Sequence, residues 1–261
     1  MMINDFVMIQ RHFPKNDDLR LYFICDVHYG AQEHMDREWT DFCCNFMRDP
    51  NAYLILGGDL LNNATKTSVS NCYRETVRPM QAKRDMANML KPLKSRILCG
   101  VSGNHERRNK DVDDDPMYDI MAKLDLEDIY RENMAFLKIQ VGNTKSNGNT
   151  NPTYMLCVTH GAGGGALSGG VINRNERFGY AIDGADALLV GHSHKPMISQ
   201  PSKIVIDPHN NRVVTRPFKV IVGTSWLGYG GYALQKQLLP TSHAPQVITL
   251  CGKRKKISVE M

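Results

Sequence analysis

Short apolar runs, each bounded by glycine or polar residues, recur along the first two thirds of the chain. They are rich in leucine, β-branched and aromatic residues and span four to seven positions, which is typical of buried strands. A further run, 135–141, alternates apolar and polar residues and predicts a strand with one face exposed. The predicted buried strands cover residues 19–25, 53–56, 96–101, 154–159 and 187–190.

Segments with helical spacing separate these strands. Residues 36–47 place Trp39, Phe42, Cys43 and Phe46 on one face, and residues 76–91 form an amphipathic pattern that ends before Pro92. Asp115 followed by Pro116 is a favourable start for a helix that continues to about residue 124. Residues 173–182 have the composition of another helix.

The pattern changes from residue 203 onward, where short β-type runs follow one another without helices between them. We predict from this a mostly antiparallel sheet in the last third, and a turn-rich surface hairpin loop over residues 145–152. No internal linker or repeat divides the chain. The whole pattern predicts one α/β domain over residues 1–261, with two packed mixed β-sheets flanked by helices.

Each of the five predicted buried strands is followed, within two residues, by a cluster of polar residues. Because strands of one sheet end at a common edge, the loops after them converge, so these side chains are expected to meet in one crevice. Imidazole nitrogens with carboxylate and amide oxygens suit divalent Mn, Fe, Zn or Ni. The absence of cysteine from the clusters argues against a structural thiolate zinc site. The clusters are Asp26-Val-His28, Gly57-Gly-Asp59, Gly103-Asn-His105-Glu106, His160-Gly161 and Gly191-His-Ser-His194.

The order of these five blocks resembles the calcineurin-like metallophosphoesterase superfamily. The resemblance implies two divalent metal ions, with manganese as the first expectation and iron, zinc or nickel as alternatives. It implies that Asp26, His28 and His194 hold the first metal. It implies in the same way that Asn104, His160 and His192 hold the second metal, and that Asp59 bridges both.

The resemblance also implies a reaction. Two metals held roughly 3.5–4 Å apart activate a shared hydroxide for in-line attack on phosphorus. His105 is then expected to act as general acid toward the leaving oxygen, and Glu106 to orient and charge it. Arg107 is a candidate clamp for a substrate phosphate, with Arg108 as the weaker alternative and a solvated arginine as the plain interpretation of either.

The substrate is less defined than the reaction. The Asp-Arg-Gly sequence of serine/threonine protein phosphatases is missing after Asp59, and residues 58–70 resemble phage- and prophage-encoded members of the superfamily. We therefore expect a phosphodiesterase that acts on a nucleotide or a nucleic acid. A phosphomonoesterase for small metabolites and a non-catalytic binding module on the same fold are the alternatives.

Composition restricts the setting. The net charge of +5 is compatible with an anionic substrate but does not by itself predict a nucleic-acid-binding protein. Seven cysteines, an odd number at irregular spacing, fit reduced thiols in a cytoplasmic protein. The N-terminus has no signal-peptide pattern, and no run reaches the roughly 18 apolar residues of a membrane span.

Other motifs have two interpretations each. The glycine-rich stretch 161–170 matches part of a dinucleotide-binding fingerprint, but a flap beside the second metal or a plain surface loop fits better. Asn62 and Asn63 are candidates for substrate contacts or for local capping. Within the aromatic stretch 226–232, Trp226 is expected to pack in the core, and stacking on a base or lining of the substrate cleft is the alternative. The basic run 253–256 is expected to be a solvated strand end rather than a nucleic-acid contact.

Overall fold

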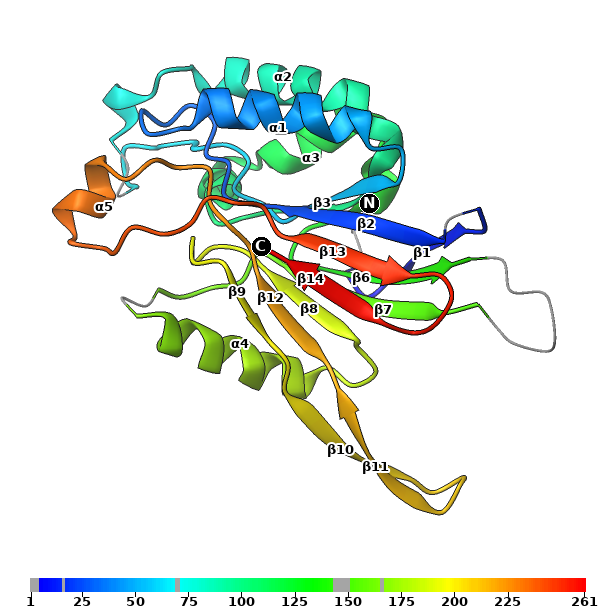
Figure 1. Cartoon of the computed structure of the whole chain (residues 1–261). Coiled ribbons are helices and arrows are strands. Elements are labelled where there is room, and N and C mark those ends of the chain that lie inside the picture. The colour runs from blue at the N-terminus through cyan, green and yellow to red at the C-terminus, as the bar shows by residue number, and fades with distance from the viewer. Residues whose placement is uncertain (1–4, 16, 69–70, 143–150, 165–166) are drawn as a thin grey trace.

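Two six-stranded mixed sheets pack face to face, with helices on their outer faces (Figure 1). This computed structural model describes residues 5–15, 17–68, 71–142, 151–164 and 167–261. The predicted α/β class with two packed mixed sheets is therefore confirmed. Most of the expected loop 145–152 lies outside the described residues.

The first sheet, called sheet I, has the strand order β14-β13-β2-β3-β4-β5. Strands β2 to β5 run parallel to one another, while β13 is antiparallel to β2 and β14 is antiparallel to β13. Its strands are β2 (Asp18–Ile24), β3 (Ala52–Leu56), β4 (Ile97–Val101), β5 (Tyr130–Arg131), β13 (Val247–Cys251) and β14 (Ile257–Glu260).

The second sheet, sheet II, has the strand order β1-β6-β7-β8-β12-β9. Strands β7, β8 and β12 are parallel neighbours at its centre, and antiparallel pairing joins β6 to β7 and β9 to β12. Its strands are β1 (Ile9–Phe13), β6 (Met134–Val141), β7 (Thr153–Thr159), β8 (Ala187–Val190), β9 (Met197–Ser199) and β12 (Lys219–Val222).

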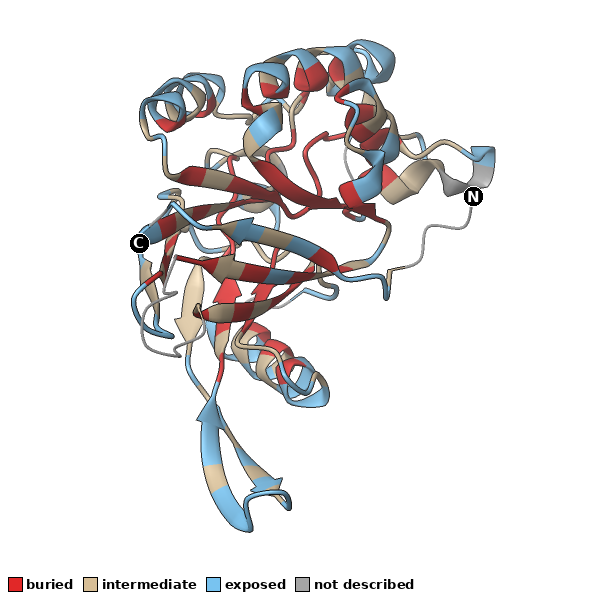
Figure 2. Ribbon diagram, turned by 90° about the vertical axis from the view of Figure 1, so that its right-hand side faces the viewer, coloured by how far each residue is buried: buried red, intermediate tan, exposed pale blue. Residues whose placement is uncertain are grey.

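The last third of the chain does not form the single antiparallel sheet that its pattern predicted. Strands β10 (Ser202–Asp207) and β11 (Arg212–Pro217) form a separate hairpin that projects from the body, with most of its residues exposed (Figures 1 and 2). The next strand, β12, joins sheet II parallel to β8, and β13 and β14 return to sheet I. Local alternation predicts a strand but not its partner, because pairing depends on the packing of distant segments.

Helices α1, α2 and α3 cover the outer face of sheet I, and α4 packs against β9 and β12 of sheet II (Figure 1). Asp115 caps α3 as expected, since its Oδ1 accepts from the backbone N–H groups of Met117 and Tyr118 at 3.1 Å. Helix α4 begins five positions before the predicted start and includes Gly169 and Gly170. The helices are α1 (Asp36–Arg48), α2 (Pro79–Leu90), α3 (Pro116–Lys123), α4 (Ser168–Ala181) and α5 (Gly231–Gln235), with 3₁₀ turns η1 (Cys72–Arg74), η2 (Lys91–Arg96), η3 (Glu106–Val112) and η4 (Glu127–Ile129).

One continuous hydrophobic cluster includes residues from both sheets and from helices α1 to α3. Trp226 belongs to it and packs edge-on against Trp39, with ring centroids 5.2 Å apart, which confirms the core position expected for this tryptophan. Within the described part of the chain, no helix combines the length and the apolar character that crossing a membrane requires.

Candidate metal centre

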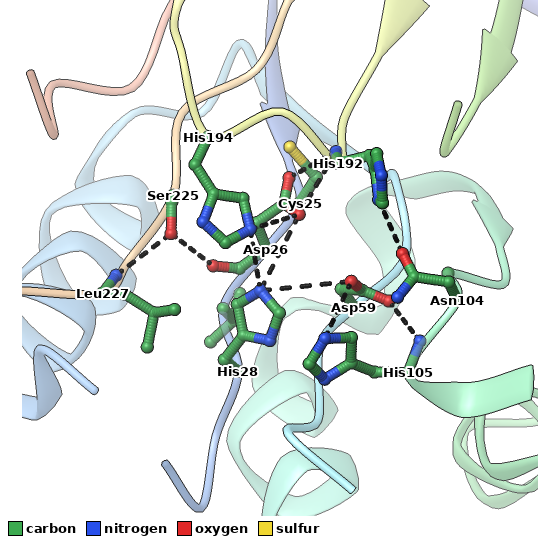
Figure 3. A network of polar contacts seen from close by, with 12 residues as sticks. Cys25, Asp26, His28, Asp59, Asn104, His105, His192, His194, Ser225 and Leu227 are labelled. Atoms are coloured by element: carbon green, nitrogen blue, oxygen red, sulfur yellow. Dashed lines mark hydrogen bonds and ion pairs between the residues drawn. The ribbon is translucent and has the colours of Figure 1, made fainter. Parts of the chain in front are cut away.

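The polar clusters singled out in the sequence meet where the two sheets present the same edge (Figure 3). Sheet I contributes the loops after its parallel strands β2, β3 and β4, and sheet II contributes the loops after its parallel strands β7 and β8. The site therefore forms only when both sheets are in place. The loops carry Asp26 and His28, Asp59, Asn104 and His105 from sheet I, and His160, His192 and His194 from sheet II.

The first group of ligand-type atoms belongs to Asp26, His28 and His194, which lie within 4.8 Å of one another. The Nε2 atoms of His28 and His194 are 3.1 Å apart, and the His194 Nε2 is 3.2 Å from Oδ1 of Asp26. Two imidazole nitrogens at this distance need a proton or a cation between them, because two lone pairs repel. This group coincides with the first metal set expected from the sequence.

The second group consists of Asp59, His160 and His192, whose ligand-type atoms also lie within 4.8 Å of one another. The amide oxygen of Asn104 faces the same space, at 3.0 Å from Nε2 of His160 and 2.6 Å from Nδ1 of His192. The four side chains correspond to the second metal set with its expected bridging carboxylate.

Asp59 lies between the two groups. Its Oδ2 is 3.2 Å from Nε2 of His160 in the second group and 4.0 Å from Nε2 of His28 in the first. The same oxygen is 3.8 Å from Nε2 of His105. A buried carboxylate in this position can offer one oxygen to each of two cations.

Both carboxylates favour the ionised state despite complete burial. Burial alone would raise the pKa of Asp26, but the neighbouring His194 lowers it to about 2. Burial also opposes ionisation of Asp59, yet His160 and His105 hold its pKa well below the usual range. The centre therefore contains two buried negative charges that need positive partners.

The histidines of the centre differ in how readily they carry a positive charge. Burial disfavours a charged His160, but the Asp59 carboxylate outweighs burial and raises the pKa of His160 to about 9. Burial, together with His105 and His194, keeps the pKa of His28 well below its usual value, and among the described residues its buried Nδ1 has no hydrogen-bond partner. Ionised carboxylates and neutral imidazoles are the forms that bind metals, so Asp26, Asp59 and His28 are already in the binding form, and a divalent cation would take the place of the proton on His160 beside Asp59.

The backbone at the centre is held in an uncommon conformation. Asp26, His28, Asp59, His192 and His194 have φ values of 54°, 51°, 50°, 69° and 55°, in the left-handed region that non-glycine residues rarely adopt. Such residues cost about 1–3 kcal/mol each and persist only where the surroundings fix them. Their concentration at the ligand positions supports a functional reason for the strain.

Two glycines allow the loops after β3 and β4 to approach each other. A Cβ atom on Gly103 would lie 2.0 Å from Oδ1 of Asp59, and one on Gly58, whose φ is +84°, would lie 2.4 Å from the nitrogen of Gly103. Any larger residue at either position would push the Asp59 loop away from the Asn104 loop.

The hydrogen bonds of Glu106 in the described part of the chain go to backbone groups rather than to His105, so the expectation that Glu106 orients this imidazole stays a prediction. Glu106 is fully buried and accepts hydrogen bonds from the backbone N–H groups of Asp59 at 2.8 Å, Gly103 at 2.9 Å and Leu61 at 3.1 Å. Burial, together with the charge of Asp59, raises the pKa of Glu106 to about 7. Its observed role is to join the loops after β3 and β4.

His105 contacts other groups. Its Nδ1 faces the carbonyl oxygen of Asn62 at 2.6 Å, and its Nε2 lies 2.9 Å from a guanidinium nitrogen of Arg108. The structure thus places Arg108, rather than Arg107, against the imidazole. Arg107 instead donates to the carbonyl oxygen of Ser102 at 2.6 Å.

The neighbouring polar residues stabilise these loops. The side chain of Asn62 donates to Glu75, and that of Asn63 donates to the carbonyl oxygen of His105 at 2.8 Å, so both asparagines help to hold the loop after β3. Ser225, which the sequence analysis did not select, donates to the carbonyl oxygen of Asp26 at 3.3 Å. Ser225 lies three residues after the buried strand β12. Its position after a strand resembles that of the selected clusters, but serine is not a typical metal ligand, and the residue was therefore not selected.

Comparison with known proteins gives structural likenesses only. No protein-family model matches the chain, and no curated protein matches it. A conserved uncharacterized protein from Streptococcus pneumoniae TIGR4, described as a predicted phosphoesterase, is 12% identical, with a TM-score of 0.37 over 93% of this chain and 88% of that chain. The calcineurin-like phosphoesterase YfkN from Bacillus subtilis is 11% identical, with a TM-score of 0.39 over 93% of this chain and 90% of that chain.

Proposed function

We propose that this protein is a metal-dependent phosphoesterase that hydrolyses a phosphodiester of a nucleotide or a nucleic acid. The observation that carries the proposal is the position of Asp59 between two groups of nitrogen and oxygen ligands. When bound, two divalent cations would lower the pKa of water and neutralise charge that develops on the phosphoryl oxygens.

The contacts of His105 support a role for this residue in moving a proton. Because a carbonyl oxygen only accepts, the Nδ1 of His105 carries a hydrogen toward Asn62, and Nε2 faces Asp59 and the ligand groups. In this arrangement the Nε2 accepts from Arg108. A phosphate oxygen that draws the guanidinium away would leave Nε2 free to take up a proton from solvent, and the resulting imidazolium would pass that proton to the leaving oxygen.

The surroundings of Arg108 support a diester over a monoester. A phosphomonoester carries nearly two negative charges at neutral pH, whereas a diester carries one. One terminal nitrogen of Arg108 already donates to the carbonyl oxygens of Asn62 at 2.9 Å and Asn63 at 3.4 Å, which leaves few N–H groups for phosphoryl oxygens, and a diester offers two free oxygens where a monoester offers three. This favours the singly charged substrate.

The test compares hydrolysis of an aryl phosphate monoester, an aryl phosphodiester and single-stranded DNA by the purified protein, with added Mn²⁺ and with chelator. We expect metal-dependent cleavage of a diester that falls by about 10²–10⁴-fold in His105→Ala. The matched control is His12→Ala, which removes an exposed imidazole on β1 and should leave activity unchanged.

If the protein prefers the monoester, the proposed activity changes from a phosphodiesterase to a phosphomonoesterase that uses the same centre. Absence of turnover together with absence of bound metal would contradict the enzyme and leave the binding module as the remaining function.

A further inference from the structure

A cavity of about 460 Å³ lies at the base of the projecting hairpin. It is bordered by the end of β11, the beginning of β12 and the turn between β13 and β14. Lys219, in its wall, pairs with Ala187 at the beginning of β8, whereas the candidate metal centre follows the end of β8. The cavity and the metal centre are therefore at opposite edges of sheet II.

The cavity is predominantly positive. Arg216, Lys219, Lys255 and Lys256 line it, together with the single carboxylate of Asp186. That carboxylate is already used, since it pairs with Lys255 at 2.7 Å and accepts from the backbone N–H of Met155 at 2.8 Å. Among the residues that the structure describes, no carboxylate lies within 4.0 Å of the charged nitrogens of Arg216, Lys219 or Lys256.

Two of these cations are placed unfavourably for the protein alone. Arg216 lies directly opposite Lys203 in the β10–β11 ladder, and like charges in this position destabilise a sheet. Lys219 is partly buried, its ammonium donates to the neutral side-chain oxygen of Gln200, and burial lowers its pKa. A bound anion would relieve both arrangements.

The positive surface extends beyond the cavity. Arg212 is on the same face of the hairpin as Arg216, four residues away along β11, which corresponds to roughly 13 Å. On the other side, the exposed Lys253 and Arg254 continue the turn that contributes Lys255. Arg212 is paired with Asp207 at 3.3 Å and Lys253 with Asp17 at 3.7 Å, so the cations that have no carboxylate within 4.0 Å among the described residues are Arg216, Lys219, Lys256 and Arg254. Four such cations, from the base of the hairpin and from the turn between β13 and β14, suit a linear anion that carries several charges better than a single phosphate ion.

We propose that this surface, formed by Arg216, Lys219, Lys255 and Lys256, binds the phosphates of a single strand of nucleic acid, at a place separate from the metal centre. Lysine and arginine contacts to phosphates make such binding independent of sequence and sensitive to salt. The proposal does not depend on the phosphoesterase reaction, because binding requires no bond cleavage.

The experiment measures fluorescence anisotropy of a labelled single-stranded DNA dodecamer in excess chelator, which excludes hydrolysis. We expect the protein to bind, and Arg216→Gln/Lys219→Gln to weaken binding at least tenfold and to lower the slope of log affinity against log salt by about 1–2. The matched control is Arg84→Gln/Lys91→Gln, which removes two charges at a different cavity, near the end of α2, and should change affinity less than twofold.

A second variant, Lys255→Gln/Lys256→Gln, changes only exposed side chains of a turn and should also weaken binding, which excludes misfolding as the cause. If the control variant weakens DNA binding equally, the effect depends only on the net charge of the protein and not on this surface, and the proposal is overturned. Unchanged binding by Arg216→Gln/Lys219→Gln, or no binding by the unmodified protein at low salt, would overturn it as well. Hydrolysis of an aryl phosphodiester by the same variants tests the metal centre separately.

Discussion

At the residue scale, the two consecutive arginines after Glu106 have different contacts, one with a side chain of the candidate centre and the other with the backbone. Arg108 contacts the imidazole of His105, while Arg107 donates to the backbone of Ser102. We expect Arg108→Ala to lower kcat/KM on the preferred phosphodiester by about 10–100-fold, because it removes a charge-assisted contact to the substrate phosphate that is worth roughly 1.5–3 kcal/mol. Arg107→Ala should mainly lower stability. Steady-state kinetics and urea unfolding of both variants would measure this difference, and a larger kinetic loss in Arg107→Ala would contradict it.

Glu106 is the second residue whose role is clear only from its contacts. Glu106→Gln replaces one of two accepting oxygens by a donor, which would face backbone N–H groups of Asp59, Gly103 or Leu61. We expect a loss of about 1–3 kcal/mol in the free energy of unfolding, since a buried N–H would be left without an acceptor. Urea denaturation without metal measures it, with the exposed Glu38→Gln as control. Equal stability of the two variants would argue against the bridging role.

These contacts could not be inferred from the sequence. The block that contains His105 and Glu106 suggested that one orients the other, because they are neighbours in the chain. In the structure, each side chain contacts the loop after β3, more than forty positions earlier. Chain proximity identifies candidate groups, whereas their partners depend on how two loops pack.

At the scale of elements, one ion pair connects a helix to a strand of sheet I. Arg20 on β2 donates from two nitrogens to the carboxylate of Asp49 at the end of α1, and this contact lowers the pKa of Asp49. A lowered pKa means that the pair stabilises the fold above the usual pKa of about 3.9 and loses this contribution as pH falls through the folded value.

We therefore expect Asp49→Asn to be less stable than the unmodified protein by about 1 kcal/mol at pH 7, with a smaller difference at pH 3.5. Urea unfolding at both pH values would measure the two differences. Asp41→Asn, which affects an exposed pair with Arg37 at 3.9 Å, should change stability little at either pH. A difference for Asp49→Asn that stays constant with pH would exclude the ionic contribution.

The elements that position the centre were also the easiest to predict. Strands β2, β3, β4, β7 and β8 are largely apolar runs that have a glycine or a polar residue within two positions of their ends, so both their identity and their ends are visible in the sequence. Strands β5 and β9 have two and three residues, too few to show alternation. The start of α4 was missed because Gly169 and Gly170 suggest a loop, while in the structure they occupy its first turn.

At the scale of the whole molecule, the expected ligands are divided between the sheets. Asp26, His28, Asp59 and Asn104 follow strands of sheet I, whereas the remaining three histidines follow strands of sheet II. Cations bound between them would connect the two halves of the core. Ions that bind the folded chain and not the unfolded one stabilise it by about 2.7 kcal/mol at a hundredfold excess over Kd.

This predicts that chelator lowers the melting temperature of the metal-loaded protein by roughly 5–10 °C, at about 2–4 °C per kcal/mol for a chain near this size. Thermal unfolding with saturating Mn²⁺ and with chelator would measure the shift. Asp59→Asn should lose most of it, because this carboxylate faces both groups of ligands, and His12→Ala should retain it. An equal melting temperature of the unmodified protein in both conditions would mean that the two sheets meet at this edge without a cation, and the strained loops would then need another explanation.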